Sequence, residues 1–426
     1  MSTHNELGGA IKKMIMTNVS ESMSYEWPEV TDALKKRLLR QAEDSLSIYN
    51  NGGIFGVFEK RFARYHNRKH ALLFSSGTAA IHAMYVVAGL GVGDEVICPA
   101  YTFFATVTPL LQTGAIPILC DCDENGNIDP IEIAKKITSR TKAVVITHMW
   151  GIPCQMKKIV ELCRKNNLLL LEDCSHAHGA KVGGKVVGSF GQLSAWSIQG
   201  QKVISGGEGG VFATNDDELY YKALLFGHYN KRCKTEIPTE HRLYKFATTG
   251  MGLKLRAHPL AIAIADELLS SIDKARKNRH EYAMELNRRL KQFSRIVSPP
   301  KMNGEIEPSW YAFIIQVKGD NRESTRAKLI VESLNAMGLP EFDLPTSTCP
   351  LNLLPLFQEP GTLFDVYKCK NNTFKYLPGQ FPRAETYYRS AVKLPIWSSK
   401  RHRKVMNKYF DALCNVLAKV ERDGYE

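Results

Sequence analysis

The chain reads Trp196-Ser197-Ile198-Gln199-Gly200-Gln201-Lys202-Val203-Ile204-Ser205-Gly206-Gly207-Glu208-Gly209-Gly210 where a short apolar stretch gives way to a glycine-rich turn. A lysine held at a strand end by a turn is well placed to condense with a carbonyl group. That reaction needs a neutral amine, and burial or a neighbouring cation lowers the pKa of lysine from about 10.4 toward about 7–8. The alternative is a surface lysine before a hairpin, so the surrounding sequence must decide.

Short apolar runs alternate with helical patterns on either side of this stretch. We expect strands near residues 70–74, 95–98, 116–120, 142–147, 168–172, 193–197 and 210–214, and helices near 77–88, 104–113, 130–137 and 154–166. This rhythm predicts an α/β fold with a mostly parallel sheet covered by helices on both faces. Ligands of such sheets bind at the carboxyl ends of the strands.

The pattern divides the chain into three parts. Residues 1–28 are expected to be irregular, residues 29–272 to form a large domain, and residues 273–426 to form a smaller α+β domain. Within the large domain we expect one helix after Thr31 and a second over 57–65, after an Asn-Gly turn. A helical stretch over 259–293 is expected to lead into the small domain, which has strand signals at 311–317 and helical signals at 322–336 and 400–418.

Composition narrows the function classes. The 426 residues are 44% hydrophobic and 23% charged, an ordinary globular composition, and no apolar run is long enough to cross a membrane. The start of the chain lacks a signal-peptide pattern, so we expect a cytoplasmic protein without a membrane partner. The ten cysteines include no CxxC pair with zinc-ligand spacing, and no metal is expected.

The formal net charge of +13 has three interpretations. Basic residues cluster near 231–234, 274–279 and 400–404. They could be solvated helix faces, could attract phosphorylated substrates, or could bind nucleic acid. No zinc-finger or RNA-recognition motif supports the last interpretation, so we do not expect a nucleic-acid partner.

A carboxylate and two histidines follow the apolar strand at 168–172. Asp173 could face a pyridine nitrogen and keep it protonated, or it could cap a helix. His176 suits a hydrogen bond to a phenolic oxygen of a cofactor, and His178 suits a structural role. A metal held by this His-x-His pair lacks an evident third ligand.

An anion cradle and an aromatic residue complete the candidate site. Ser76, Gly77 and Thr78 open a helix after the first strand, where backbone N–H groups favour phosphate. Ser197 could add a hydroxyl, and Phe103 could stack on a pyridine ring. Each has a plain structural alternative, helix capping for the first three and a core position for Phe103. A covalent anchor, a carboxylate and an anion cradle at one sheet edge are what pyridoxal 5′-phosphate (PLP) requires.

From about residue 30 to residue 420 the chain resembles the DegT/StrS group of PLP-dependent sugar aminotransferases, which have fold type I. The matching pieces include the segments 75–80, 93–96, 99–106, 148–153, 172–180, 188–191 and 207–210, together with Lys202 and the late fragments 381–385 and 394–396. The resemblance implies a large domain with a mixed, mostly parallel seven-stranded type of sheet, a small C-terminal domain, and a homodimer whose active site is shared between subunits.

The resemblance also implies roles for individual residues. Lys202 would form the internal aldimine with PLP and move the proton, and Asp173 would pair with the pyridine nitrogen. His176 would lie near the phenolic oxygen, where many members have glutamine. Ser76, Gly77, Thr78 and Ser197 would hold phosphate, and Phe103 would stack on the ring.

One loop departs from the family pattern. Many members have Gly-x-Asn-x-Arg in the loop that enters the partner's site, whereas this chain has Lys254 in place of the asparagine, followed by Arg256. Lys254 could still reach phosphate as a point charge. Arg256 and Gly53 are expected near the substrate. The Gly-x-Lys-x-Arg-x-His-Pro form resembles members that act on keto-cyclitols.

These observations favour transfer of an amino group from glutamate or glutamine to a nucleotide-linked ketosugar or a keto-cyclitol, in a ping-pong reaction. Polysaccharide or antibiotic amino-sugar synthesis is the pathway usual for the group. Two alternatives stay open. The first is a PLP-dependent sugar dehydratase; in such dehydratases of the family a histidine replaces the lysine, so Lys202 argues against it. The second is a non-catalytic regulator of the same fold.

Overall fold

The computed structural model describes residues 27–319 and 325–422. It confirms the predicted α/β fold with a mixed, mostly parallel seven-stranded sheet, in the order β1-β9-β8-β5-β4-β2-β3. These strands are β1 (His70–Phe74), β2 (Glu95–Pro99), β3 (Ile116–Cys120), β4 (Thr141–Thr147), β5 (Leu169–Asp173), β8 (Leu193–Ser197) and β9 (Gly210–Thr214). Strand β9 runs antiparallel to β1 and β8, and the other neighbouring pairs are parallel.

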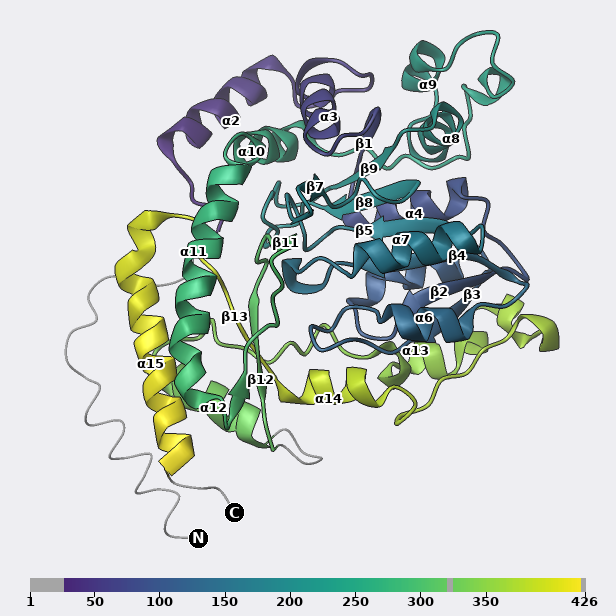
Figure 1. Cartoon of the computed structure of the whole chain (residues 1–426). Helices are drawn as coiled ribbons and strands as arrows, with labels where there is room; N and C mark the ends of the chain where they lie inside the picture. The colour runs from purple at the N-terminus through teal and green to yellow at the C-terminus, as the bar shows by residue number, and fades with distance from the viewer. Residues whose placement is uncertain (1–26, 320–324, 423–426) are drawn as a thin grey trace.

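Helices cover both faces of this sheet (Figure 1), because successive side chains of the strands alternate between two hydrophobic cores. Leu72 and Val145 belong to one core, and their neighbours Leu73 and Val144 belong to the other. The first core also contains side chains of α4 (Gly77–Val87), α5 (Thr108–Leu111), α8 (Asp217–Gly227), α9 (Lys231–Glu236), α13 (Pro355–Gln358) and α14 (Pro382–Ser390). The second contains side chains of α3 (Gly53–Tyr65), α6 (Pro130–Lys136), α7 (Met156–Lys165) and α10 (Pro259–Ser270).

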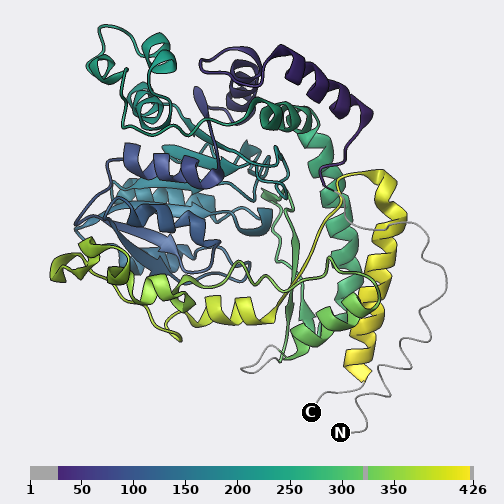
Figure 2. The same cartoon turned by 180° about the vertical axis from the view of Figure 1, so that it is seen from behind.

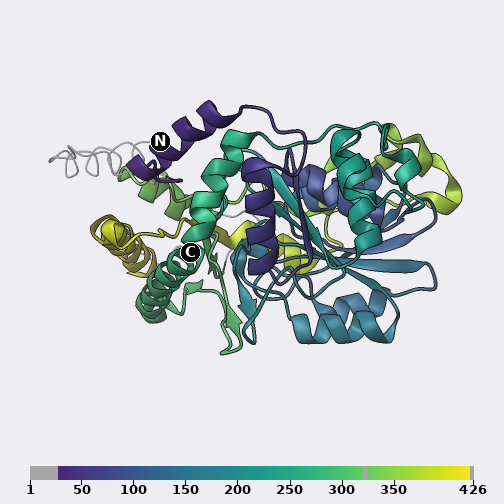
Figure 3. The same ribbon diagram turned by 90° about the horizontal axis from the view of Figure 1, so that it is seen from above.

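The N-terminal helices differ in part from the expectation. Helix α2 (Asp32–Asp44) packs against α10, as Figure 3 shows, and Thr31 caps it by accepting a hydrogen bond of 3.2 Å from the N–H of Leu34. Helix α3 begins at Gly53, earlier than the predicted residue 57. Its buried Phe55, Phe58 and Phe62 follow the spacing of a single helix face, which extends the helix into the glycine-rich turn.

Two predicted helices are interrupted. The stretch over 104–113 forms a 3-10 turn (Phe104–Thr106) and the short α5, because Pro109 starts a new helical turn without continuing the previous one. The stretch over 259–293 forms α10 and α11 (Ile272–Leu290), which meet at Ser271, followed by a 3-10 turn over Lys291–Phe293.

A third hydrophobic core lies in the C-terminal part of the chain. It joins α11, α12 (Thr325–Ala336) and α15 (Arg403–Arg422) to an antiparallel sheet of β10 (Val297–Ser298), β12 (Phe313–Val317) and β13 (Ala391–Leu394). A further small sheet pairs β11 (Ile306–Glu307) with β6 (Lys181–Val182), which pairs with β7 (Lys185–Val186).

The chain crosses between the two parts more than once. Seen from behind in Figure 2, the yellow-green segment that ends in α14 runs along the large sheet, and Leu351, Tyr367 and Tyr387 belong to a core of that sheet. A domain boundary at residue 272 stays a proposal, because 351–391 contributes to a core of the large sheet while α14 also contacts β12 and α12 of the C-terminal part. Residues 1–26 of the predicted irregular segment lie outside the described residues. Among the described residues, no helix has both the length and the apolar character that a membrane crossing requires.

Candidate active site

A cavity of about 360 Å³ opens at the carboxyl ends of the parallel strands. Ser76 follows β1, Phe103 follows β2, and Thr147, Asp173 and Ser197 end β4, β5 and β8. Lys202 and His176 also line it, and so do Gly77 and Thr78. The fold therefore brings most of the predicted site residues to the lining of one cavity, because parallel strands direct their following loops to the same edge.

Lys202 is held by its backbone and is partly buried. Its N–H donates to the carbonyl of Gln199 over 2.9 Å, and its own carbonyl accepts from the indole of Trp27 over 2.7 Å. The Nζ atom lies 4.5 Å from the centre of the Tyr311 ring. Burial lowers the pKa of Lys202 to about 8, a shift that Asp173 opposes and the cation of Lys393 reinforces. A substantial fraction of this amine is therefore neutral near pH 8.

Asp173 is oriented by a buried group of hydroxyls. Thr106 Oγ1 donates to Asp173 Oδ2 over 2.7 Å, and the N–H of Ser175 donates to Oδ1 over 3.0 Å. The same Thr106 hydroxyl lies 2.8 Å from that of Thr102 and 3.1 Å from that of Thr147. Since Thr106 gives its proton to Asp173, the other two threonines can donate to it. This network fixes the direction in which the carboxylate faces the cavity.

The N-terminus of α4 forms the other end of the cavity. Ser76 caps the helix by accepting a hydrogen bond of 3.1 Å from Ala79 N–H. A Cβ atom on Gly77 would lie 2.5 Å from Ser197 Cβ, so only glycine lets the backbone amides come this close to the Ser197 hydroxyl. An exposed helix N-terminus beside a hydroxyl is a suitable place for a phosphate group.

Aromatic rings surround His176. Its imidazole stacks on Tyr311, with ring centres 4.2 Å apart and planes 10° apart, and Trp150 lies 5.5 Å away. Burial, followed by the cations of Lys202 and Lys393, lowers the pKa of His176 far below its usual value, so the ring is neutral. Its Nδ1 is buried without a hydrogen-bond partner among the described residues. Phe103 lies on the cavity wall, 36% exposed, beside Phe104.

Three predicted residues do not line this cavity in the single chain. Lys254 is exposed and its backbone bridges to His228, and Arg256 donates from Nη1 to the carbonyl of Ile48 over 3.2 Å. Gly53 begins α3. Their participation in a site formed with a second subunit therefore stays a prediction.

Sequence reasoning missed several residues that line the cavity. Trp150, Tyr311 and Lys393 come from loops and strands far along the chain from Lys202, and no local pattern distinguishes them from core or surface residues. Thr106 stood within a recognised segment, where its spacing from Thr102 was the available signal. Trp27, which donates to the carbonyl of Lys202, precedes residue 30, where the resemblance to the family begins.

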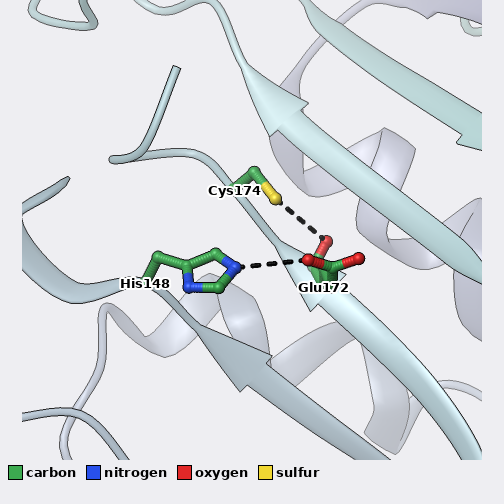
Figure 4. Close-up of side chains that lie close together, drawn as sticks. All are labelled: His148, Glu172 and Cys174. Carbon is green, nitrogen blue, oxygen red and sulfur yellow. Dashed lines mark hydrogen bonds and ion pairs between the residues drawn. The ribbon is translucent and has the colours of Figure 1, made fainter. Parts of the chain in front are cut away.

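The described residues bring together one group with metal-ligating side chains: His148, Glu172 and Cys174, all buried (Figure 4). Their atoms already have structural partners. His148 Nδ1 accepts a hydrogen bond from the N–H of Cys154, and Glu172 accepts from the backbone N–H groups of 188, 190 and 191 over 2.7–2.8 Å. Burial raises the pKa of Glu172, but His148, the cation of Arg68 and the N–H of Gly191 together lower it below its usual value. The group explains how the strand end next to Asp173 is anchored.

Some of the predicted basic clusters are structural. Arg232 is buried and pairs with Glu59 and Glu236, with the closest atoms 2.6 Å apart in each pair. Arg279 is also buried and donates to Ser398 Oγ and to the carbonyl of Trp310. These two cations are therefore not available to a nucleic acid.

A mostly parallel sheet with a lysine, a carboxylate and a helix N-terminus in one cavity at its edge is the arrangement that a PLP-dependent α/β enzyme requires. The sequence pattern of the DegT/DnrJ/EryC1/StrS aminotransferase family matches residues 30–408. The chain belongs to this family, and the family's PLP-dependent chemistry implies that cofactor.

Named relatives agree with the family. The chain is 30% identical over 346 residues to the spore coat polysaccharide biosynthesis protein SpsC of Bacillus subtilis, covering 80% of this chain and 84% of SpsC. It is 38% identical over 232 residues to the GDP-perosamine synthase of Escherichia coli O157:H7, covering 54% and 62%. It is 29% identical to a putative L-glutamine:3-amino-2,3-dideoxy-scyllo-inosose aminotransferase of Micromonospora echinospora, covering 78% of each.

A solved structure has the same fold. The aminotransferase from Psychrobacter cryohalolentis is 25% identical to this chain and superposes with a TM-score of 0.82, over 93% of this chain and 99% of that one. The family thus supports an aminotransferase of amino-sugar or polysaccharide synthesis.

Proposed function

We propose that the chain transfers an amino group from glutamate or glutamine to a nucleotide-linked ketosugar or a keto-cyclitol, in two half-reactions of a ping-pong cycle. The observation that carries the proposal is the position of Lys202, an amine with a pKa of about 8, in the same cavity as Asp173 and the N-terminus of α4.

The cavity fits PLP. Lys202 would attach it, Asp173 would meet the ring nitrogen, and Ser76, Gly77, Thr78 and Ser197 would hold its phosphate. The buried, unpartnered Nδ1 of His176 suits the phenolic oxygen, and Phe103 is placed to cover a ring face. When bound there, PLP supplies an electron-accepting ring that stabilises negative charge on a substrate carbon.

Two residues of the chain would control the protons of the reaction. The Nζ of Lys202, neutral in a large fraction near pH 8, would take a proton from the carbon of the amino donor and later return one to the carbon of the keto acceptor. Asp173, pinned by Thr106, would keep the ring nitrogen protonated throughout.

The relatives support the substrate class. Their names include a GDP-perosamine synthase and a putative L-glutamine:3-amino-2,3-dideoxy-scyllo-inosose aminotransferase, which supports a nucleotide-linked sugar or a cyclitol as the acceptor. We further propose a homodimer in which Lys254 of the partner subunit reaches the phosphate, with Arg256 and Gly53 near the substrate.

The experiment is a half-reaction. PLP-loaded protein is mixed with glutamate or glutamine in the absence of acceptor, and the visible absorbance is followed. We expect the absorbance of bound PLP to be replaced by that of the aminated cofactor, with a stoichiometric keto acid released. An unchanged spectrum with both donors, at confirmed PLP occupancy, contradicts the proposal. Product formation without a donor would favour the dehydratase alternative, and salt-sensitive nucleic-acid binding would favour the regulator.

A further inference from the structure

A second cavity of about 340 Å³ lies beside the one that contains Lys202. Gln201, Tyr311 and Lys393 line both cavities, so these three side chains form the boundary between them. Trp27, Glu341 and Asp343 also line the second cavity. A substrate larger than its reacting group could therefore extend from Lys202 past this boundary.

Lys393 occupies an unusual position for a cation. Its neighbours in β13, Val392 and Leu394, are buried in the C-terminal core, so Lys393 lies on the opposite face of the strand. Ala391, on the same face, belongs to a core of the large sheet. Lys393 is therefore directed toward the large domain and the two cavities, and its side chain is only 27% exposed.

Asp343 holds the Lys393 ammonium in a readily replaced contact. The Nζ atom lies 3.1 Å from Asp343 Oδ2, and the two backbones exchange hydrogen bonds of 2.8 and 3.0 Å. The Asp343 side chain is 52% exposed. Because partly exposed ion pairs contribute little to stability, an anion of a substrate can displace this carboxylate without unfolding the strand.

The charge of Lys393 affects two groups that line the cavity of Lys202. It lowers the pKa of Lys202 and that of His176, in each case as a smaller cause than burial. The acidic groups that line the two cavities are Asp173 and Glu208 in the first, and Glu341 and Asp343 in the second. Asp343 is paired with Lys393 in the lining of the second cavity, where an incoming anion would compete with it.

We propose that Lys393 is an anion-binding residue of the substrate site, which holds a carboxylate or phosphate group of the substrate while its amine or carbonyl carbon reaches Lys202. Asp343 is the partner of Lys393 when no substrate is present. This assignment rests on the proposed function, since it concerns the same cavity, and it names the charge that the substrate must carry.

The test separates the two sources of the anion. PLP-loaded wild-type protein is titrated by calorimetry with glutarate, a dicarboxylate without an amine, and with inorganic pyrophosphate. The same titrations are made on K393Q, K393R, D343N and K400Q, the last removing one exposed charge away from both cavities. We expect K393Q to bind at least one of the two probes tenfold or more weakly than wild type, and K393R to restore most of that affinity. D343N should bind the same probe several-fold more tightly than wild type, and K400Q should bind it with unchanged affinity.

The outcomes are distinct. Loss of glutarate binding alone assigns Lys393 to the amino donor, loss of pyrophosphate alone assigns it to a nucleotide-linked acceptor, and loss of both assigns a shared subsite. The proposal is overturned if wild-type protein binds neither probe, or if K393Q binds both as tightly as wild type. These binding results do not depend on turnover, so a failed glutamate half-reaction would contradict the proposed function without deciding the role of Lys393.

Discussion

Trp27 donates its indole N–H to the backbone carbonyl of Lys202 over 2.7 Å. The tryptophan precedes residue 30, where the family match begins, so a residue outside that match holds the turn that carries the reactive amine. The guanidinium of Arg279 lies 5.1 Å from the centre of the Trp27 ring. Because Arg279 is buried, this contact ties the Lys202 turn to the C-terminal core.

Replacing Trp27 with phenylalanine should loosen the Lys202 turn while keeping a ring beneath Arg279. A neutral hydrogen bond contributes about 0.5–1.5 kcal/mol, so we expect W27F to lower the free energy of unfolding by about 1 kcal/mol and PLP affinity several-fold. W27A should cost more, because it also removes the ring. Denaturant unfolding and PLP titration measure both effects. Equal values for W27F and wild type would show that the hydrogen bond has no role.

The pKa of Lys202 predicts a pH dependence of stability in the protein without cofactor. The folded pKa is lowered from 10.5 to about 8, so between these values the unfolded state binds the proton and the folded state does not. The free energy of unfolding of wild type should therefore rise with pH from about 8 to 10.5, relative to K202M. Parallel denaturant titrations of the two proteins over this range test it. A constant difference would mean that the amine titrates as an ordinary lysine.

Much of this site could be predicted because its residues follow strand ends in order. Ser76, Asp173 and Ser197 each stand directly after or at the end of an apolar run, and a parallel sheet brings such positions together. Lys393 and Tyr311 could not be predicted in this way. They lie on or beside strands of another sheet, and only the docking of that sheet against the large one places them at the cavity.

The dependence on tertiary packing also explains where the predicted fold differs from the structure. Periodicity predicted the seven strands of the large sheet within a residue or so, because each is an apolar run bounded by polar residues. It missed the first turn of α3, since the glycines at 52 and 53 favoured a loop, and buried Phe55 outweighs them only once the sheet is in place. Tertiary packing decided that boundary.

Replacing Thr106 should weaken PLP binding more than replacing its buried neighbour Thr102. A hydrogen bond to a charged acceptor contributes about 1.5–3 kcal/mol, so T106V should weaken PLP binding by about tenfold or more, because the Asp173 carboxylate is left without its hydroxyl donor. T106S keeps the hydroxyl and should restore most of the affinity. T102V should have a smaller effect, since Thr102 reaches Asp173 only through Thr106. Equilibrium titration with PLP compares the three variants, and equal losses in T106V and T102V would contradict this order.

Ser197 should contribute to PLP binding through a hydrogen bond to the phosphate group of the cofactor. We expect S197A to bind PLP about tenfold more weakly than wild type, and to bind pyridoxal, which lacks the phosphate, with unchanged affinity. The smaller side chain also relieves no strain, because Gly77 already leaves room for it. Spectroscopic titration with the two aldehydes provides the comparison. A similar loss for both would place Ser197 at the ring or in the packing of the turn.

A shared active site predicts that two inactive subunits can repair each other. In the single chain Lys254 lies outside the cavity that contains Lys202, so each site would take its lysines from different subunits. K202A and K254A homodimers should each be nearly inactive in the glutamate half-reaction. When the two variants are co-expressed and mix at random, half of the dimers are hybrids. Each hybrid has one site with both lysines and one site with neither, so the mixture should have about one quarter of wild-type activity. Recovery that stays at the level of the separate variants would mean that Lys254 acts within its own subunit or not at all.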